Sequence, residues 1–372
     1  MKVLRLLSVK ALSFLAIIFL PFDQLFTSIF PNANYSPFRW LTIVLGMFIF
    51  RYNDINRLKP LVRIFYYLIA YCCLSFVSVT WSSDPGATIS YSAQISVMLL
   101  FSIVALSTLS LEKTILSKLS FFSSLIGGVV SGLALMGFFS VAEIDPNRRL
   151  SFLGIGVNAV AISIGYALLL GICYFFSPER KRVRDIIVIT ASLIMIAFIL
   201  RTGTRSAVWG IFIAIGLSYL LSFNLKFRNI LRFIFLSIFL IISANYLFEN
   251  YLGNRMTQRI LAVTPQDIKT NVRFELWQDG IDWFSSNLLG TGAGNEQEAY
   301  LNWDIKEAHN VFVSSLIQLG IPALLIMLIV FVTLFIRIIR IKIPYNKFTA
   351  ACLYFFLLIQ MMKGSFVQTR IF

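Results

Sequence analysis

His309 is the only histidine in the chain, so it is the residue best suited to move a proton near neutral pH. It directly follows a polar stretch, residues 249–308, that separates two long apolar segments. Removing a proton from a hydroxyl group at neutral pH favours a base whose pKa lies near the ambient pH. A structural histidine at a helix start is the competing interpretation. We therefore take His309 as the candidate catalytic base, with Asn310 beside it as a supporting residue.

Acidic residues of the same polar stretch could replace His309 as the base if burial raised their pKa. There are nine of them: Glu249, Asp267, Glu275, Asp279, Asp282, Glu296, Glu298, Asp304 and Glu307.

Arginine side chains form a second candidate set. Arg201 and Arg205 flank a glycine in a short hairpin between two apolar segments, so both guanidinium groups can face one ligand. Arg148 and Arg149 precede another apolar segment, and Arg273 lies in the polar stretch. A guanidinium is a planar, permanently charged fork that suits phosphate oxygens. The pattern predicts an anion site, best suited to a diphosphate, whereas snorkelling from a helix end is the alternative for any single arginine.

Two weaker signals accompany these residues. The glycines between Gly290 and Gly294 form a turn whose backbone amides could approach a phosphate closely, which makes Gly292 and Gly294 supporting candidates. Such a run is as often only a tight turn, and it lacks the lysine of a nucleotide-binding loop. Asn158 lies inside an apolar segment and needs a hydrogen-bond partner, either for helix packing or in a cavity wall.

The elements that carry these residues are predicted to be membrane helices. The chain is 58% hydrophobic and 13% charged, whereas soluble proteins are roughly 25% charged. Stretches long enough to cross the bilayer predict an all-α, polytopic helix bundle of about 11 (10–12) transmembrane helices, forming a single integral membrane domain over residues 1–372. The predicted spans are 11–30, 38–51, 61–80, 88–108, 119–141, 152–176, 185–200, 206–222, 230–248, 309–336 and 346–363.

The distribution of Lys and Arg predicts the orientation. With the N-terminus in the cytoplasm, alternate loops hold most of the positive charge, so the net charge of +15 reflects topology and does not indicate nucleic-acid binding. Residues 249–308 then form a large external, periplasmic loop, and the candidate site faces the same side. The four cysteines lie in apolar segments, so we expect no disulfide and no metal site.

The external loop contains a predicted amphipathic helix. Four apolar residues recur at spacings of three, four and three: Phe274, Trp277, Ile281 and Phe284. Three acidic residues are expected to point outward from it: Glu275, Asp279 and Asp282. This helix is predicted to lie flat at the membrane interface and cap the bundle, with Arg273 in its first turn.

The order of these motifs resembles the O-antigen ligase and polymerase superfamily of bacterial inner-membrane glycan transferases. The matching elements are residues 201–206, 273–277 and 289–294, followed by His309-Asn310 and Gly320. The motif resemblance covers residues 201–324, and the rest of the chain agrees in hydrophobic pattern only.

The resemblance implies glycan transfer on the external leaflet of the membrane, without a cofactor. The donor would be a glycan on undecaprenyl diphosphate, and the acceptor either another lipid-linked repeat unit (polymerase) or a sugar of lipid A–core (ligase). Arg205 and Arg273 would bind the diphosphate, and His309 would orient or deprotonate the acceptor hydroxyl. Arg201, Arg148 and Arg149 would have supporting roles. The motifs leave ligase and polymerase both open.

Two other functions compete with this one. A transporter or flippase for lipid-linked glycans would place charges near the membrane midplane, often with broken helices and internal repeats. The predicted spans are instead nearly free of charge, and the two halves of the sequence show no repeat. An oligosaccharyltransferase that passes glycan to protein would use related chemistry. Membrane lipids are the expected surroundings in every case.

Overall fold

The computed structural model describes residues 2–19, 44, 62–109, 114–138, 157–223, 272–301 and 308–362. These residues form helices joined by turns, and no β-strand occurs among them. The predicted span 230–248, all but one residue of 38–51, and Arg148 and Arg149 lie outside the described residues. The all-α class is confirmed, whereas the number of spans, the single domain and the full extent of the external loop stay predictions.

Most α-helices of the described part agree closely with predicted spans, but α1 begins nine residues before the predicted span 11–30, and α14 lies in the polar stretch. They are α1 (Lys2–Phe19), α5 (Val62–Val77), α6 (Pro85–Leu109), α7 (Ile115–Leu135), α8 (Val157–Tyr174), α9 (Arg182–Thr202), α10 (Arg205–Ser222), α14 (Val272–Ser286), α15 (Val311–Ile339) and α16 (Pro344–Met361). Two 3-10 helices join them, η3 (Ser78–Thr80) and η5 (Glu296–Tyr300). Within this part of the chain, 6 helices are long and apolar enough to cross a membrane.

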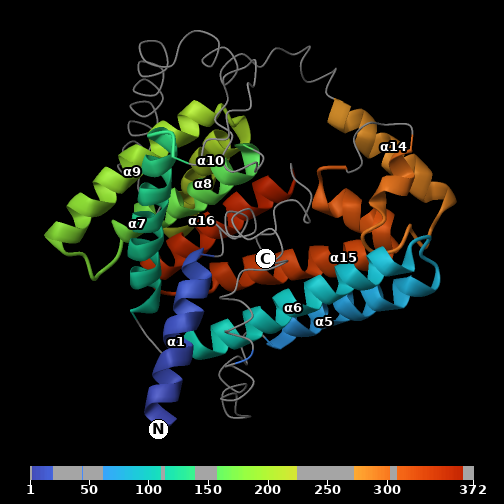
Figure 1. Cartoon of the computed structure of the whole chain (residues 1–372), viewed down its shortest axis with the longest axis horizontal. Helices are drawn as coiled ribbons and strands as arrows, with labels where there is room; N and C mark the ends of the chain where they lie inside the picture. The colour runs from blue at the N-terminus through green and yellow to red at the C-terminus, as the bar shows by residue number, and fades with distance from the viewer. Residues whose placement is uncertain are drawn as a thin grey trace.

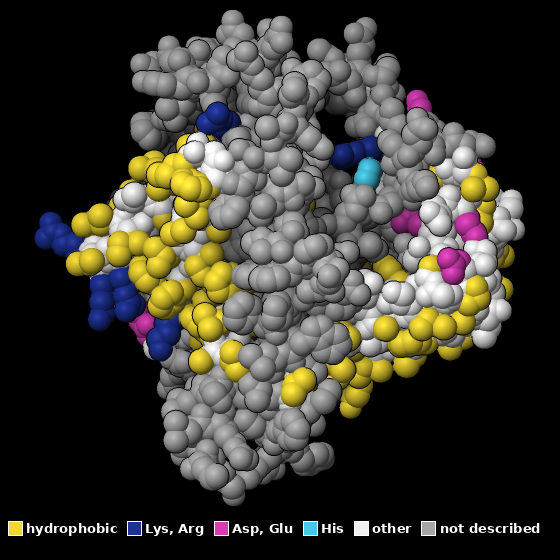
Figure 2. Space-filling view, viewed as in Figure 1, with side chains coloured by type: hydrophobic (Ala, Val, Ile, Leu, Met, Phe, Trp, Pro, Cys, Tyr) yellow, Lys and Arg dark blue, Asp and Glu magenta, His cyan; other side chains and the backbone are white. Residues whose placement is uncertain are grey.

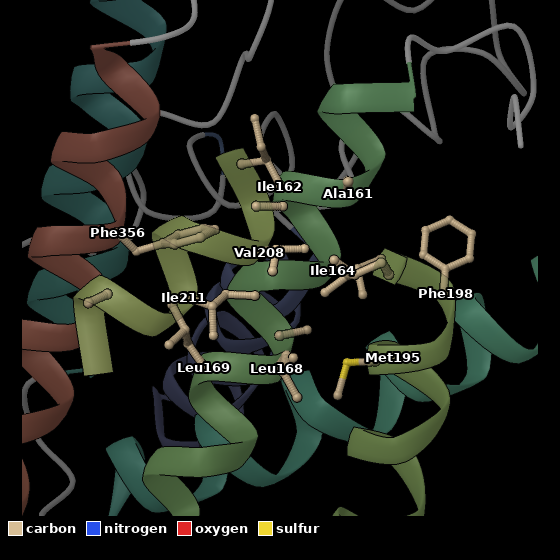
Figure 3. Packing of buried hydrophobic residues seen from close by; sticks show 14 of the residues in the cluster. Ala161, Ile162, Ile164, Leu168, Leu169, Met195, Phe198, Val208, Ile211 and Phe356 are labelled. Carbon is tan, nitrogen blue, oxygen red and sulfur yellow. The ribbon is translucent and has the colours of Figure 1, made fainter. Parts of the chain in front are cut away.

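The first structural group, called here the bundle, consists of α7, α8, α9, α10 and α16 (Figure 1). Its apolar side chains meet around α8, where Ile164 is fully buried between residues of α9 and α10 (Figure 3). Two glycines of α7 allow this packing. A Cβ on Gly127 would lie 2.5 Å from the Cβ of Ala167, and one on Gly128 would lie 2.6 Å from the Cβ of Ala191. Small residues of this kind let membrane helices approach closely.

The second group, called here the loop-bearing unit, contains α5, α6, α15, α14 and the turn between α14 and η5. Helices α5, α6 and α15 lie side by side, and α14 lies at the same end of the molecule as the start of α15 (Figure 1). One apolar cluster joins Ala293 of the turn to Leu319 and Ala323 of α15. Another joins Leu276 of α14 to Ile317 of α15. The polar stretch is therefore packed onto a predicted span.

Helix α15 is broken, although the sequence predicted a continuous span over 309–336. Gly320 has φ 73° and ψ −169°, a combination open only to glycine, and Pro322 lacks the N–H that would bond to the carbonyl of Gln318. The carbonyls of Ile317 and Gln318 instead accept hydrogen bonds from the backbone N–H groups of Thr291 and Gly292, each at 2.9 Å. The glycine-rich turn thus completes the backbone hydrogen bonding of the helix.

Helix α14 forms as predicted, but its buried face is rotated from the predicted one. Of the four predicted apolar residues, Phe284 is buried and Trp277 packs against the buried cluster, whereas Phe274 and Ile281 are exposed, at 51% and 47% of their surface. Leu276 is fully buried. Gly280 decides this rotation, because a Cβ there would meet the hydroxyl of Tyr300 and lie 2.5 Å from Cδ1 of Ile317. The face with glycine at its centre is the one that can approach η5 and α15. The three acidic residues expected to point outward are exposed: Glu275, Asp279 and Asp282.

Candidate functional site

Arg273 lies in the first turn of α14 with its side chain half-buried. Burial lowers the pKa of its guanidinium, yet an arginine remains charged at physiological pH. Trp277 follows one helical turn later and therefore lies on the same side of α14. The position of Trp277 consequently determines where Arg273 is held.

Trp277 connects α14 to the segment that carries the histidine. Its indole Nε1–H donates a hydrogen bond of 2.7 Å to the carbonyl of Ala308, the residue before His309. The backbone N–H of Ala308 donates a second bond of 2.7 Å, to Oε1 of Glu296. Ala308 is fully buried, so both of its peptide groups are bonded away from solvent. The arginine of α14 and the histidine are therefore brought to one end of the loop-bearing unit.

His309 has an unusual backbone conformation. Its φ of 53° is the only positive φ among non-glycine residues of the described chain. This left-handed conformation is uncommon for residues other than glycine, and it persists when neighbouring contacts impose it. The side chain is partly exposed, and Figure 2 shows the histidine on the surface next to Lys or Arg side chains. The imidazole is thus accessible while the backbone beneath it is fixed.

Asn310 fixes the other side of His309. Its Oδ1 accepts hydrogen bonds from the backbone N–H groups of Phe312, at 3.0 Å, and Val313, at 3.4 Å. This is an N-cap of α15, which satisfies donors that the helix leaves unbonded. The structure gives Asn310 a local role as the cap of the helix that His309 precedes.

Glu296 is a buried carboxylate in η5 with 5% of its surface exposed. Besides the Ala308 amide, its Oε1 accepts a bond of 2.9 Å from the hydroxyl of Ser314, and its Oε2 accepts one of 3.1 Å from Nε2 of Gln318. The sequence offered Glu296 only as one of nine acidic residues. No spacing in the sequence distinguishes it from the others, because its partners, Ala308 and two residues of α15, lie 12 to 22 residues further along the chain.

Two neighbouring groups have shifted pKa values. Burial raises the pKa of the Tyr300 hydroxyl, and the charges of Glu296 and Asp279 raise it further, so this phenol stays neutral. Burial also raises the pKa of Glu298. Tyr300 is therefore part of the buried support and does not act as an ionised group.

The backbone amides of the glycine-rich turn are used within the protein. Gly294 N–H donates to Oε1 of Gln318 at 2.9 Å, and Ala293 N–H donates to Oγ of Ser78 at 3.1 Å. The N–H groups of residues 290, 291, 292 and 295 also donate to backbone carbonyls. Gly292 and Gly294 have φ values of 91° and 84°, which explains the need for glycine. This arrangement favours the tight-turn interpretation over a phosphate cradle.

The arginine hairpin belongs to the bundle. Helix α9 ends at Thr202, Gly203 follows in the left-handed conformation with φ 63°, and α10 begins at Arg205. Arg201 is exposed and Arg205 half-buried. The hydroxyl of Thr204 donates a 3.3 Å hydrogen bond to Oδ1 of Asn158 in the first turn of α8. Asn158 thus finds its partner in the hairpin and ties it to α8.

The candidate arginines are carried by two different groups of helices. Arg273 is linked to the His309 segment through Trp277, whereas Arg201 and Arg205 are held by the bundle. In Figure 1, α14 lies at the upper right and the α9–α10 pair at the upper left. Arg148 and Arg149 lie outside the described residues. No group of three or more His, Cys, Asp or Glu side chains that could hold a metal occurs in the described part.

Residues 190–328 match the family model described as O-antigen ligase. This match supports the resemblance to the O-antigen ligase superfamily. The matched segment runs from α9 through α10 and α14 to the middle of α15, and it contains Arg201, Arg205, Arg273 and His309. No curated protein matches the chain. The superfamily and the apolar helices together indicate a membrane protein with a glycan transfer activity of the ligase or polymerase type.

Proposed function

We propose that the protein transfers a glycan from undecaprenyl diphosphate to a sugar hydroxyl, as an O-antigen ligase or an O-antigen or exopolysaccharide polymerase. The proposed location is the bacterial inner membrane, with the N-terminus in the cytoplasm and the site facing the periplasm. The O-antigen ligase match over residues 190–328 supports the transfer, and the bias of Lys and Arg toward one set of loops supports the orientation.

One observation carries this proposal: the 2.7 Å hydrogen bond from Trp277 to the carbonyl of Ala308. This bond links the helix that presents a cationic Arg273 to the segment that presents the only imidazole of the chain. A donor diphosphate and an acceptor hydroxyl need these two kinds of group close together. Holding reactants in a fixed geometry supplies a large part of an enzymatic rate enhancement.

The proposed reaction is a displacement at the anomeric carbon of the donor sugar. His309 takes the proton of the acceptor hydroxyl, and the oxygen forms a bond to the anomeric carbon. The bond from that carbon to the phosphate oxygen breaks, and undecaprenyl diphosphate leaves with the electron pair. The imidazolium then releases its proton to water. Negative charge grows on the leaving diphosphate, where fixed guanidinium groups stabilise it.

Arg273 and Arg205 are the proposed diphosphate ligands, with Arg201, Arg148 and Arg149 in support. Arg273 approaches from α14, and Arg205 approaches from the hairpin that Thr204 and Asn158 hold. A diphosphate presents several oxygens along its length, so cations from two helical groups can bind it together.

The break in α15 bears on the transporter alternative, since broken helices near the membrane midplane often form ion or substrate sites. Here the break leaves the carbonyls of Ile317 and Gln318 without donors from their own helix. They accept hydrogen bonds from the backbone N–H groups of Thr291 and Gly292 instead. The break therefore serves as the docking point of the glycine-rich turn, which favours the transferase over a transporter.

The decisive experiment deletes the gene and resolves the surface glycolipids by gel electrophoresis. The strain is complemented with wild type, His309→Ala, Arg273→Ala, Arg205→Ala, or the control Gln297→Ala, an exposed neighbour in η5. Core carrying a single repeat without a ladder identifies a polymerase. Bare core with accumulated lipid-linked polymer identifies a ligase.

We expect each of the three site variants to lose product, since loss of a positioned base costs about 10²- to 10⁴-fold. Gln297→Ala should restore the wild-type pattern. Full rescue by His309→Ala at wild-type expression would show that the histidine is structural. Normal product from Arg273→Ala would remove that residue from the diphosphate site.

A further inference from the structure

We propose that Glu296 is a positioning residue that holds the backbone of His309 through the amide of Ala308. This inference rests on the proposed function, in which His309 contacts the acceptor. Glu296 itself is 5% exposed, so it lies beneath the site and does not reach a substrate. Its effect on the reaction passes through the peptide segment that it binds.

The residue before His309 is held by two hydrogen bonds. Ala308 donates its N–H to Oε1 of Glu296 and accepts from the indole of Trp277, both at 2.7 Å. These two bonds, with the cap made by Asn310 on the far side, restrict the backbone on both sides of His309. The restriction explains how a non-glycine residue is held at φ 53°.

The charge of the carboxylate explains why glutamate occupies position 296. Among the described residues Glu296 accepts from three donors, of which Ala308 N–H and the Ser314 hydroxyl share Oε1 and the amide of Gln318 binds Oε2. A charged acceptor makes shorter and stronger hydrogen bonds than a neutral one. A buried carboxylate is also costly unless such donors surround it. Both oxygens must therefore accept.

A glutamine of the same shape cannot replace it. Its amino group would face either the N–H of Ala308 or the amino group of Gln318, and two donors would then oppose each other. Rotating the Gln318 amide does not help, because its Oε1 accepts the N–H of Gly294 at 2.9 Å. The glycine-rich turn therefore fixes the direction of Gln318, and Gln318 in turn requires an acceptor at position 296.

These contacts form one continuous path from Gly294 through Gln318 and Glu296 to Ala308. The glycine-rich turn therefore contributes to the reaction indirectly, because it orients Gln318 and Glu296, which hold the backbone next to His309. Buried polar networks of this kind specify a single arrangement when every member is satisfied.

The test compares Glu296→Gln with wild type in membrane vesicles supplied with the lipid-linked donor. We expect kcat to fall about 10- to 100-fold, the size of effect that a small misplacement of a catalytic group produces. The KM for the donor should change little, because the diphosphate ligands are untouched. Combined with His309→Ala, the substitution should cause no further loss. The control Gln297→Ala changes the exposed neighbour of Glu296 and leaves the Ala308 bond intact, so its kcat should stay close to wild type.

A second readout needs no activity. The chain has one histidine, so carbethoxylation by diethyl pyrocarbonate, followed by mass spectrometry of the purified protein, reports on His309 alone. We expect faster modification in Glu296→Gln than in wild type or Gln297→Ala, because the segment beneath the imidazole is released. Should Glu296→Gln fail to insert, Glu296→Asp carries the same test, since it keeps the charge but shortens the reach to Ala308.

Wild-type kcat and wild-type histidine reactivity in Glu296→Gln would overturn the positioning role. An equal loss in Glu296→Gln with and without His309 present would overturn it as well, because the two residues would then act separately. If wild type transfers no glycan, or His309→Ala is fully active, the proposed function fails instead. The reactivity measurement would still decide whether Glu296 holds the histidine.

Discussion

The bundle and the loop-bearing unit are stabilised in different ways. In the bundle, helices approach through glycine and alanine, and among the described residues the buried hydroxyls of Ser124, Ser131 and Ser192 have no hydrogen-bond partner. In the loop-bearing unit, side chains bond to backbone groups of distant segments, as Trp277 and Glu296 both do to Ala308. The bundle also has a bond of this kind, 2.9 Å from Nε2 of Gln360 to the carbonyl of Ser206. The two units therefore differ in emphasis: close packing of small residues in the first, and a network of side-chain to backbone bonds in the second.

The difference shows where precise geometry is needed. Apolar packing has no preferred direction, whereas a hydrogen bond weakens steeply when its angle or distance changes. The only histidine lies in the unit that is held by hydrogen bonds. The bundle presents Arg205 near the start of α10, where the hairpin bond between Thr204 and Asn158 provides local polar support.

The largest effect is expected from Gly290→Ala in the loop-bearing unit. Gly290 has φ 78°, and a Cβ there would lie 2.5 Å from the carbonyl oxygen of Ile317 and 2.6 Å from that of Gln318. Backbone strain and the clash together should lower stability by about 3 to 5 kcal/mol and release the turn from α15. Thermal unfolding in detergent measures the loss.

The matched control is Gly132→Ala in α7, where the nearest atom to the added Cβ is Cγ2 of Ile194 at 3.8 Å. Alanine favours a helix over glycine by about 1 kcal/mol, so this variant should be as stable as wild type or more so. A similar loss of stability in Gly290→Ala and Gly132→Ala would contradict the proposed difference between the loop-bearing unit and the bundle.

Next in size is Gly128→Ala, which tests the packing of the bundle. The new Cβ would lie 2.6 Å from the Cβ of Ala191 and 2.9 Å from its Cα. Overpacking of this kind should cost about 1–3 kcal/mol. Adding Ala191→Gly removes the clash with the Cβ of Ala191 and should restore part of the lost melting temperature. If the effects of the two substitutions simply add, residues 128 and 191 are not in contact.

A smaller effect on stability is expected from Trp277→Phe. The phenyl ring keeps most of the packing but leaves the buried carbonyl of Ala308 without its indole donor, at a cost of about 1–3 kcal/mol felt locally. Transfer activity should therefore fall more than the melting temperature. Trp209→Phe on the exposed side of α10 is the control, and an activity equal to wild type in both variants would contradict the link between α14 and His309.

The smallest effect should come from Asp185→Asn at the start of α9. This residue forms an ion pair of 2.9 Å with Arg180 on the surface of the bundle. Exposed ion pairs contribute little because water screens them. The melting temperature should stay unchanged within error, and a clear decrease would show that the bundle also depends on directed polar contacts.

The sequence predicted those features that depend on local patterns. Long apolar segments gave the helices, and the uniqueness of His309 together with the spacing of Arg201, Arg205 and Arg273 gave the candidate site. Helix α14 was found from its periodicity, but its predicted buried face is rotated from the observed one, because Gly280 and Tyr300 determine that face through a contact between distant segments.

Other features depend on contacts between distant segments. Pro322, two residues after Gly320, was a sign in the sequence that α15 could break, but nothing in the sequence indicated that Thr291 and Gly292 donate to the freed carbonyls. Glu296 looked like eight other acidic residues until Ala308, Ser314 and Gln318 were seen around it. The hydrophobic pattern of a sequence predicts its helices. Hydrogen bonds between residues that are far apart along the chain become known only from the folded structure.

The break in α15 also imposes an order of assembly. Two carbonyls of this apolar helix draw their donors from a turn that is synthesised earlier in the chain. In hydrocarbon an unbonded peptide group costs several kcal/mol, so α15 reaches its final form only once that turn has arrived. The final form of α15, the longest helix of the described chain, therefore depends on residues 290–292 being in place.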